Sequence, residues 1–142
     1  FASRDLDGIR LETAFPEGLA LCGSKTQAVQ VLLNLLLNAS FSLRSGPASR
    51  TPWIRIAAQE AAGGRVTIRV RDNGPGIPPG ALARIMDPFF TTKEPGQGLG
   101  LGLSVCHTLV SNQGGSMAVH NAPGGGAEAV FDLPGAGREE GR

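Results

Sequence analysis

The stretch RVTIRVRDNGPGI, residues 65–77, joins a strand pattern to a glycine-containing turn. Apolar and polar residues alternate from residue 66 to residue 71, which is the period of a β-strand with one buried face. An acidic residue and two glycines, Asp72, Gly74 and Gly76, follow at once. Glycines let a ligand come close to the backbone, so this strand end is a candidate binding corner as well as a plain turn.

The segments around this stretch predict a layered fold. In chain order, the patterns predict strands at residues 9–12 and 19–22, a long helix from the N-cap Ser24 to about residue 44, strands at 53–59 and 65–71, a short helix at about 79–85, a helix at about 100–112, and strands near 116–120 and 127–133. Because the strands are mainly joined as hairpins, the helices must lie on one face of the sheet. We therefore expect an α+β two-layer sandwich in one domain, residues 1–134, followed by a polar tail, residues 135–142.

The composition is that of a globular domain. The 142 residues are 41% hydrophobic and 18% charged, and the net charge is +1. Because no run of basic residues is present, we expect no nucleic-acid partner, and without an apolar stretch of about 20 residues we expect no membrane insertion. Two cysteines, Cys22 and Cys106, are too few for a disulfide framework, which favours the reducing cytoplasm. The chain opens with Phe1 rather than Met, and we expect it to be a fragment of a longer polypeptide.

The long helix carries a stripe of amides. At about 100° per residue, Gln27, Gln30, Asn34, Asn38 and Phe41 fall near one line, and the other faces are rich in leucine. We therefore expect this helix to be buried nearly all round except along the stripe. Buried amides need hydrogen-bond partners. Asn34 and Asn38 could bond to neighbouring backbone, or their carbonyl oxygens could face a hard cation such as Mg²⁺ and the phosphates that it binds.

Two further motifs suit a nucleotide. An ionised Asp72 accepts hydrogen bonds only, so it could bind an exocyclic amine such as that of adenine. Glycines at residues 96, 98, 100 and 102 open directly into a helix, and their exposed N–H groups and the helix start suit a polyphosphate. The spacing fits neither a Walker loop nor the dinucleotide-binding fingerprint, and the protein-kinase signatures are absent.

Four segments in this order resemble the motifs of the catalytic ATP-binding domain of sensor histidine kinases. That family shares a superfamily with DNA gyrase and other type II topoisomerases, MutL and a heat-shock chaperone. The segments are Asn34, Asn38 and Ala39 in the helix, residues 72–77, residues 87–93 (DPFFTTK) and residues 98–104 (GLGLGLS). The resemblance covers nearly the whole chain. It implies the Bergerat-type fold, a mixed five-stranded sheet with about three helices on one face.

The resemblance also implies a role for each motif. Asn38 is the expected Mg²⁺ ligand, Asn34 a phosphate or metal-water contact, and Asp72 the residue that binds the adenine amine. The other residues expected at the nucleotide are Gly74, Gly76 and Ile77 at the base, Phe90, Thr92 and Lys93 in a lid formed by residues 87–99, and Gly98, Leu99, Gly100, Leu101 and Gly102 at the phosphates.

The implied function is phosphoryl transfer from Mg-ATP to a histidine on a dimerisation domain, and from there to the receiver domain of a response regulator. Asn34 stands where hydrolysing relatives have a general-base Glu, and an amide cannot take a proton at neutral pH, so we expect slow ATP hydrolysis. His107 and His120 lack the sequence context of a phosphorylated histidine, so the acceptor is expected outside this chain. The resemblance further implies a cytoplasmic domain, with a parent protein that can be anchored in the inner membrane.

Two other interpretations stay open. A stand-alone serine kinase of the anti-sigma-factor type shares the helix asparagine and both glycine motifs, although residues 87–93 favour the histidine kinase. The second alternative is an interaction module with a decayed nucleotide site, because Phe41, Leu99 and Ala129 depart from the family pattern.

Overall fold

The computed structural model describes residues 2–6, 8–16, 25–44, 51–82 and 102–135. In chain order its elements are β1 (Ala2–Leu6), β2 (Ile9–Ala14), α1 (Lys25–Arg44), β3 (Trp53–Ala61), the 3₁₀ turn η1 (Ala62–Gly64), β4 (Arg65–Asp72), α2 (Pro79–Leu82), α3 (Gly102–Asn112), β5 (Ser116–Asn121) and β6 (Ala127–Pro134). The predicted helices and strands that fall on described residues are present, with small shifts at their ends. The predicted strand at 19–22, residues 83–85 of the predicted short helix and residues 136–142 of the predicted tail lie outside the described residues.

The strands form one sheet in the order β1-β2-β3-β4-β6-β5. β2 and β3 are parallel and are connected through α1, whereas all other neighbouring strands pair antiparallel. The mixed sheet of the expected α+β fold is thus confirmed. It contains one strand beyond the five expected, because β1 pairs with β2 at the edge of the sheet, with Ala2 opposite Thr13. β1 has no clean alternation of apolar and polar residues, so its pattern carries no strand signal.

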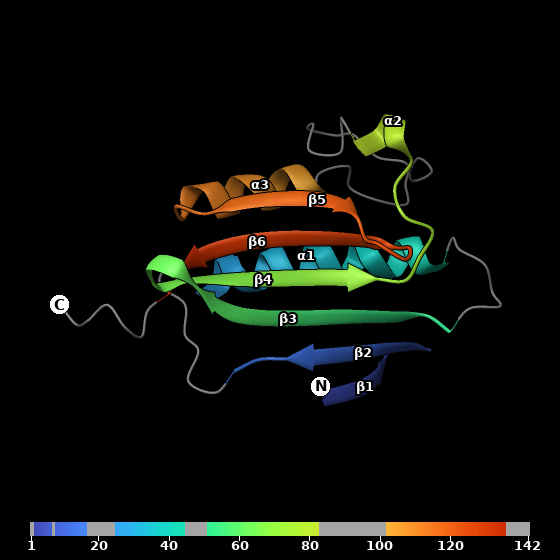
Figure 1. The fold of residues 1–142 in the computed structure, drawn as a ribbon. Coiled ribbons are helices and arrows are strands. Elements are labelled where there is room, and N and C mark those ends of the chain that lie inside the picture. Colours follow the sequence, from blue (N-terminus) through green and yellow to red (C-terminus); the bar gives the residue numbers. More distant parts are fainter. Residues whose placement is uncertain (1, 7, 17–24, 45–50, 83–101, 136–142) are drawn as a thin grey trace.

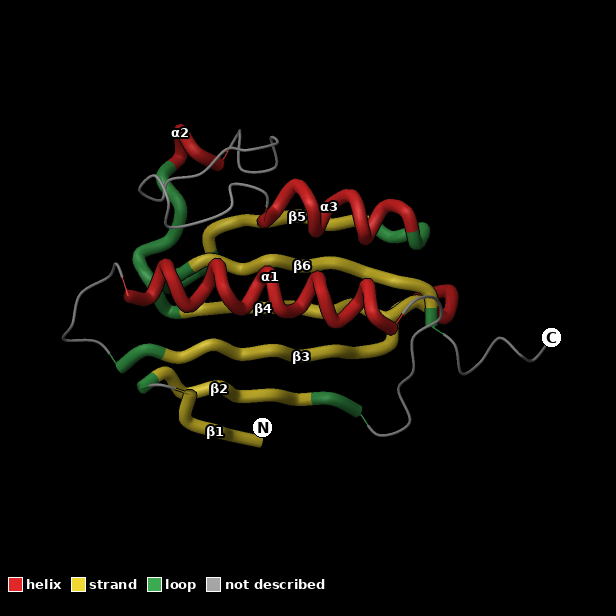
Figure 2. The backbone as a smooth tube through the Cα atoms, turned by 180° about the vertical axis from the view of Figure 1, so that it is seen from behind, coloured by secondary structure: helices red, strands yellow, loops and turns green. Residues whose placement is uncertain are grey.

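Figure 1 and Figure 2 show α1 and α3 on the same face of the sheet. Alternate residues of β3, β4 and β6 point toward this face and form one core with the inner sides of the two helices. The largest fully buried side chains are Phe131, Leu133, Val31, Val66, Val110 and Cys106. This core fixes α1 and α3 relative to the ends of the strands.

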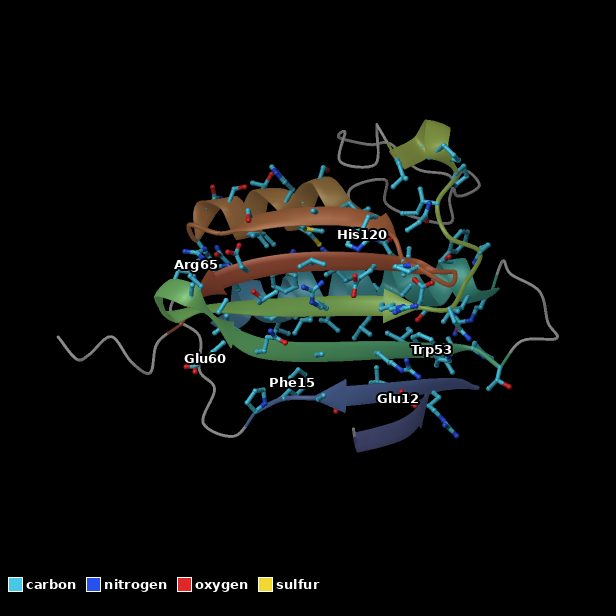
Figure 3. All side chains as sticks on the ribbon, viewed as in Figure 1. Glu12, Phe15, Trp53, Glu60, Arg65 and His120 are labelled. Atoms are coloured by element: carbon cyan, nitrogen blue, oxygen red, sulfur yellow. The ribbon has the colours of Figure 1, made fainter. Side chains whose placement is uncertain are left out.

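The opposite face of the sheet carries a row of charged side chains across five strands. Strand register aligns Glu12, Arg55, Arg71, Glu128 and His120, from β2 to β5. Arg55 Nε lies 2.6 Å from Glu12 Oε1, and His120 Nε2 lies 2.8 Å from Glu128 Oε1. Figure 3 views this face and labels Glu12 and His120 near the two ends of the row. Exposed ion pairs contribute only about 0–1 kcal/mol each, so this row keeps the open face hydrated rather than holding the sheet together.

The expectation that α1 is buried nearly all round is wrong. The buried residues of α1 are Ala28, Val31, Leu35 and Ala39, which follow one line along the helix. On the far side the exposed apolar residues are Val29 at 46%, Leu33 at 53% and Leu37 at 64% exposure. Composition alone does not show how many sides of a helix are covered. Here the sheet covers one side of α1 and α3 packs along a second. No described element covers the side that carries Val29, Leu33 and Leu37.

Two leucines on α1 test this orientation. Leu35→Ala removes a side chain that is 3% exposed and should lower the free energy of unfolding by about 2–5 kcal/mol. Leu37→Ala removes one that is 64% exposed and should change it by about 0.5 kcal/mol or less. Urea unfolding of both variants measures the difference, and equal losses would show that α1 is rotated from this orientation.

Candidate nucleotide-binding site

Asp72 ends β4 and is the one charged side chain that is buried among the described residues, at 5% exposure. It continues the alternation of buried residues in β4, so the pleat of the strand turns its carboxylate toward the helix-covered face. Oδ1 accepts hydrogen bonds from the N–H of Gly74 at 2.8 Å and of Ala127 at 3.4 Å. Desolvation by burial raises the pKa of Asp72, although these two bonds and the charge of Arg71 lower it in part. An ionised carboxylate has about four lone-pair sites, so two donors do not saturate it.

The turn after Asp72 lies against the last turn of α1. A Cβ at Gly74 would lie 3.0 Å from Ser42 Oγ and 3.1 Å from Asp72 Oδ1. The predicted close approach at Gly74 is therefore a contact with the protein itself, between a strand end and a helix end. Asn38 stands one helical turn before Ser42, and Asn34 one turn earlier still. Asn38 is therefore about one helical turn from the contact with the Asp72 turn, whereas Asn34 lies near the middle of α1.

The connection between β5 and β6 closes the other side of Asp72. A Cβ at Gly126 would lie only 1.9 Å from the carbonyl oxygen of Asp72, so no other residue fits without moving the backbone. Gly126 also has φ +85°, where side chains other than glycine are strained. In the sequence this residue lies in a glycine-rich stretch between two predicted strands. Its partner lies 54 positions away in the chain, from Asp72 to Gly126, and no local pattern shows such a contact.

Asn73 has a structural task. Its Oδ1 accepts a hydrogen bond from the N–H of Trp53 at 2.8 Å, and its Nδ2 donates to the carbonyl of Thr51 at 2.8 Å. The two bonds tie the turn after β4 to the start of β3. An amide suits this position, because it carries an acceptor oxygen for one group and a donor NH₂ for the other.

Within the amide stripe of α1, Asn34 faces α3, whereas Gln30 is exposed. Asn34 and Asn38 are both half-buried. The Asn34 side chain forms a hydrogen bond with the thiol of Cys106, and that thiol also lies 3.7 Å from the carbonyl of Val31. Burial raises the pKa of Cys106 to about 11, and the Asn34 bond opposes the shift. Asn34 therefore has a partner on α3, which is neither of the two partners considered from sequence.

Some of the remaining predicted site residues are described by the structure, and the others are not. Ile77 lies in the loop after β4, and its backbone is held by Asn121, which the sequence analysis missed. Gly102 is the first residue of α3, which starts on the side toward which α1 and β4 run (Figure 1). Phe90, Thr92, Lys93, Gly98, Leu99, Gly100 and Leu101 lie outside the described residues.

Comparison with known proteins identifies the class of this domain. The model of the family "Histidine kinase-, DNA gyrase B-, and HSP90-like ATPase" matches residues 23–137. The chain belongs to this family, and it is therefore an ATP-binding domain of the Bergerat type. The mixed sheet with helices on one face is the fold of that class.

Proteins similar to this chain include histidine kinases. The chain is 36% identical over 125 residues to the sensor histidine kinase ZraS of Klebsiella oxytoca, and the alignment covers 86% of the chain and 26% of ZraS. The chain is 44% identical over 117 residues to the two-component sensor PprA of Pseudomonas aeruginosa, which covers 80% of the chain and 12% of PprA. It is 42% identical over 125 residues to the C4-dicarboxylate transport sensor protein DctB of Rhizobium meliloti, which covers 88% of the chain and 19% of DctB. The structure of full-length ShkA in complex with AMPPNP matches with a TM-score of 0.74 and 34% identity, covering 91% of this chain and 26% of ShkA.

The chain thus spans less than a fifth of the length of PprA and of DctB, 12% and 19%. None of the helices in the described part of the chain has the length and apolar character that a membrane crossing requires.

Replacing Asp72 separates binding from stability. Because the pKa of Asp72 is raised, its ionised form destabilises the native state at pH 7. This destabilisation disappears as the pH falls through the native pKa and the carboxyl group is protonated. Asp72→Asn keeps an Oδ1 acceptor and loses this charge, so its free energy of unfolding at pH 7 should not fall. The affinity for ADP should drop about tenfold or more, because a charge-assisted bond is lost. Urea unfolding and calorimetric titration measure the two effects.

Asp132→Asn is the matched control for this substitution. Asp132 bonds to Arg65 and to Ser116 on the open face of the sheet, so its replacement should leave ADP affinity unchanged within about twofold. Unchanged ADP affinity in Asp72→Asn would mean that the base binds elsewhere.

The thiol of Cys106 makes stability depend on alkaline pH. Its pKa is raised from 9.0 to about 11 in the native state, so the native state binds more protons than the unfolded state between these values. Stability should therefore fall by up to about 2–3 kcal/mol as the pH rises from 9 to 11. Cys106→Ser lacks this titration and should show a shallower fall in urea unfolding across that range. Parallel curves for both proteins would contradict the shift.

Proposed function

We propose that this chain is the ATP-binding catalytic domain of a two-component sensor histidine kinase. It binds Mg-ATP and presents the γ-phosphoryl group to a histidine on a dimerisation domain, from which the group passes to the receiver domain of a response regulator. The names of the relatives PprA and DctB, both sensors, support this function.

One observation carries the proposal, namely the buried carboxylate of Asp72 at the end of β4. Burying a carboxylate away from water costs free energy unless hydrogen-bond donors face its oxygens. The exocyclic amine of adenine is such a donor, because it presents N–H groups and carries no charge. The neighbouring loop with Gly76 and Ile77 offers backbone beside that position, and we assign the base to this corner.

The described residues fit a magnesium ion bound together with phosphates. Among them, no three His, Cys, Asp or Glu side chains gather as a metal cage. The candidate ligands are the amide oxygens of Asn38, one helical turn from the Ser42 contact with the Asp72 turn, and of Asn34, near the middle of α1. Mg²⁺ prefers oxygen ligands, keeps several waters and commonly shares substrate phosphates. We assign Asn38 as its ligand and Asn34 as a contact to phosphate or to metal-bound water.

Bound ATP supplies the phosphoryl group, and the metal ion neutralises the charge that develops on it. The bond between the γ-phosphorus and the bridging oxygen of ADP breaks, and a phosphorus–nitrogen bond to the acceptor histidine forms. This chain contributes position and charge. Asn34 cannot take a proton from water, so water competes poorly with the histidine. Backbone N–H groups of Gly98, Gly100 and Gly102 are assigned to the phosphates, and the lid of residues 87–99, with Phe90, Thr92 and Lys93, to covering the nucleotide.

The partners follow from this chemistry. We propose the dimerisation domain of the same kinase as the acceptor and a response-regulator receiver domain as the next carrier. ATP is found in the cytoplasm, and so are receiver domains. We therefore place this domain in the cytoplasm.

Titration with AMPPNP and Mg²⁺ tests the nucleotide site. Binding should be measurable by calorimetry, and EDTA should weaken it. Asn38→Ala should remove most of the Mg²⁺-dependent gain, about tenfold, because a ligand is lost. Gln30→Ala is the matched control, since this exposed amide lies on the same helix two turns earlier, and it should bind as the natural chain does. No binding in the millimolar range would overturn the proposal.

The reaction itself is tested with radiolabelled ATP and the longer polypeptide that carries the acceptor. The label should appear in an acid-labile, alkali-stable linkage, which is the behaviour of phosphohistidine. An acid-stable label would favour the serine kinase. ATP hydrolysis by this chain alone should stay below about 1 s⁻¹, under an ordinary enzyme rate.

A further inference from the structure

We propose that Asn121, the last residue of β5, is a positioning residue for the adenine base, because its side chain fixes the loop beside Asp72. This inference rests on the proposed function. Asn121 does not need to touch the nucleotide. It acts through the backbone of Ile77, which belongs to the loop assigned to the base.

Asn121 holds Ile77 with both ends of its carboxamide. Its Oδ1 accepts a hydrogen bond from the N–H of Ile77 at 2.7 Å, and its Nδ2 donates to the carbonyl of Ile77 at 2.9 Å. The two residues are 44 positions apart in the chain. The carboxamide thus pairs with one residue as a neighbouring strand would, by donating one bond and accepting the other. This complementarity also determines which end of the amide is oxygen.

The loop has few other means of holding its shape. Pro75, Pro78 and Pro79 have no N–H, so between Asn73 and Gly80 only the three residues 74, 76 and 77 can donate from the backbone. The N–H of Gly74 is bonded to Asp72, and that of Ile77 to Asn121. Asn73 ties the start of this turn to β3, whereas Asn121 bonds to the backbone further along, at Ile77.

Gly76 fits Asn121 sterically. Its φ is +83°, and a Cβ there would lie 2.9 Å from Asn121 Oδ1 and 3.5 Å from Asn121 Cγ. The next nearest atom, the carbonyl oxygen of Gly126, would be 3.7 Å away, which is an ordinary contact. The glycine is therefore required partly by backbone conformation and partly by the asparagine. The sequence predicts only that something comes close to the backbone at Gly76, and the structure identifies one such neighbour as Asn121.

The strand end that carries Asn121 is also fixed to Asp72. The β5–β6 turn is closed by the bond from Ala122 N–H to the carbonyl of Gly126 at 2.8 Å. The same turn contacts Asp72 through Gly126 and Ala127, and Arg71 donates to the carbonyl of Pro123 at 2.8 Å. One turn thus positions both the carboxylate and the loop, so the spacing between them depends on Asn121.

The test compares Asn121→Ala with His120→Ala in this chain. His120 is the adjacent residue and makes a bond of similar length, 2.8 Å, to Glu128 on the open face of the sheet. Calorimetry measures the affinity for Mg-ADP and for inorganic tripolyphosphate, which has no base. Asn121→Ala should weaken Mg-ADP binding by about three- to tenfold, because two neutral hydrogen bonds are lost. Tripolyphosphate binding should stay within about twofold, and His120→Ala should leave both affinities within that range.

A second measurement keeps the proposal testable if Asn121→Ala is destabilised. Gly76→Ala should weaken Mg-ADP binding more in the natural chain than in Asn121→Ala. In the natural chain the new Cβ clashes with the carboxamide of Asn121, and in Asn121→Ala that carboxamide is absent. Equal losses, unchanged Mg-ADP affinity in Asn121→Ala, or a parallel loss of tripolyphosphate affinity would each overturn the role of Asn121. If the natural chain binds no Mg-ADP, the proposed function fails instead.

Discussion

Asp72 is a carboxylate held at 5% exposure at the end of a central strand. Burial of such a group is costly unless donors face it, and here one donor comes from its own turn and one from β6. To bring Ala127 close, the backbone at Gly126 must touch the carbonyl of Asp72, so closely that a Cβ would lie 1.9 Å from that oxygen. The turn after β4, the β5–β6 turn and the end of α1 therefore pack together around the end of β4, where Asp72 lies.

Sheet order makes this arrangement possible. β6 lies between β4 and β5, so the last hairpin of the chain is brought beside the strand that carries Asp72. Arg71 points to the opposite face from Asp72, yet it holds the same turn through Pro123. The β5–β6 turn is thus fixed from both faces of the sheet. A glycine-rich connection in the sequence therefore packs directly against the strand end that carries Asp72.

Much of this fold could be predicted from sequence, whereas the nucleotide-binding roles of the candidate site residues stay predictions. The errors have a common cause. The alternation in β3, β4 and β6, the N-cap before α1 and the motif at residues 72–77 are local patterns, and the elements that they predict are present. β1 lacks a pattern and is held by pairing with a neighbour. Gly126 and Asn121 act on residues far away in the chain, and the exposed side of α1 depends on what packs there. Periodicity shows which residues share a face and does not show what that face meets.

The contact between Asn34 and Cys106 bears on the role that we propose for Asn34 at the phosphates. A half-buried amide on a leucine-rich helix needs a partner at all times, because an unsatisfied group costs about 1–3 kcal/mol. Cys106 supplies one from α3, and it does so as a neutral thiol, because its pKa lies well above physiological pH. Sulfur is a weak hydrogen-bond partner, so exchanging it for a stronger one costs the amide little. A serine or a charged residue at position 106 would bind the amide more strongly and compete with any ligand for it. A buried thiol therefore gives the Asn34 amide a hydrogen-bond partner that is weak enough for a ligand to replace.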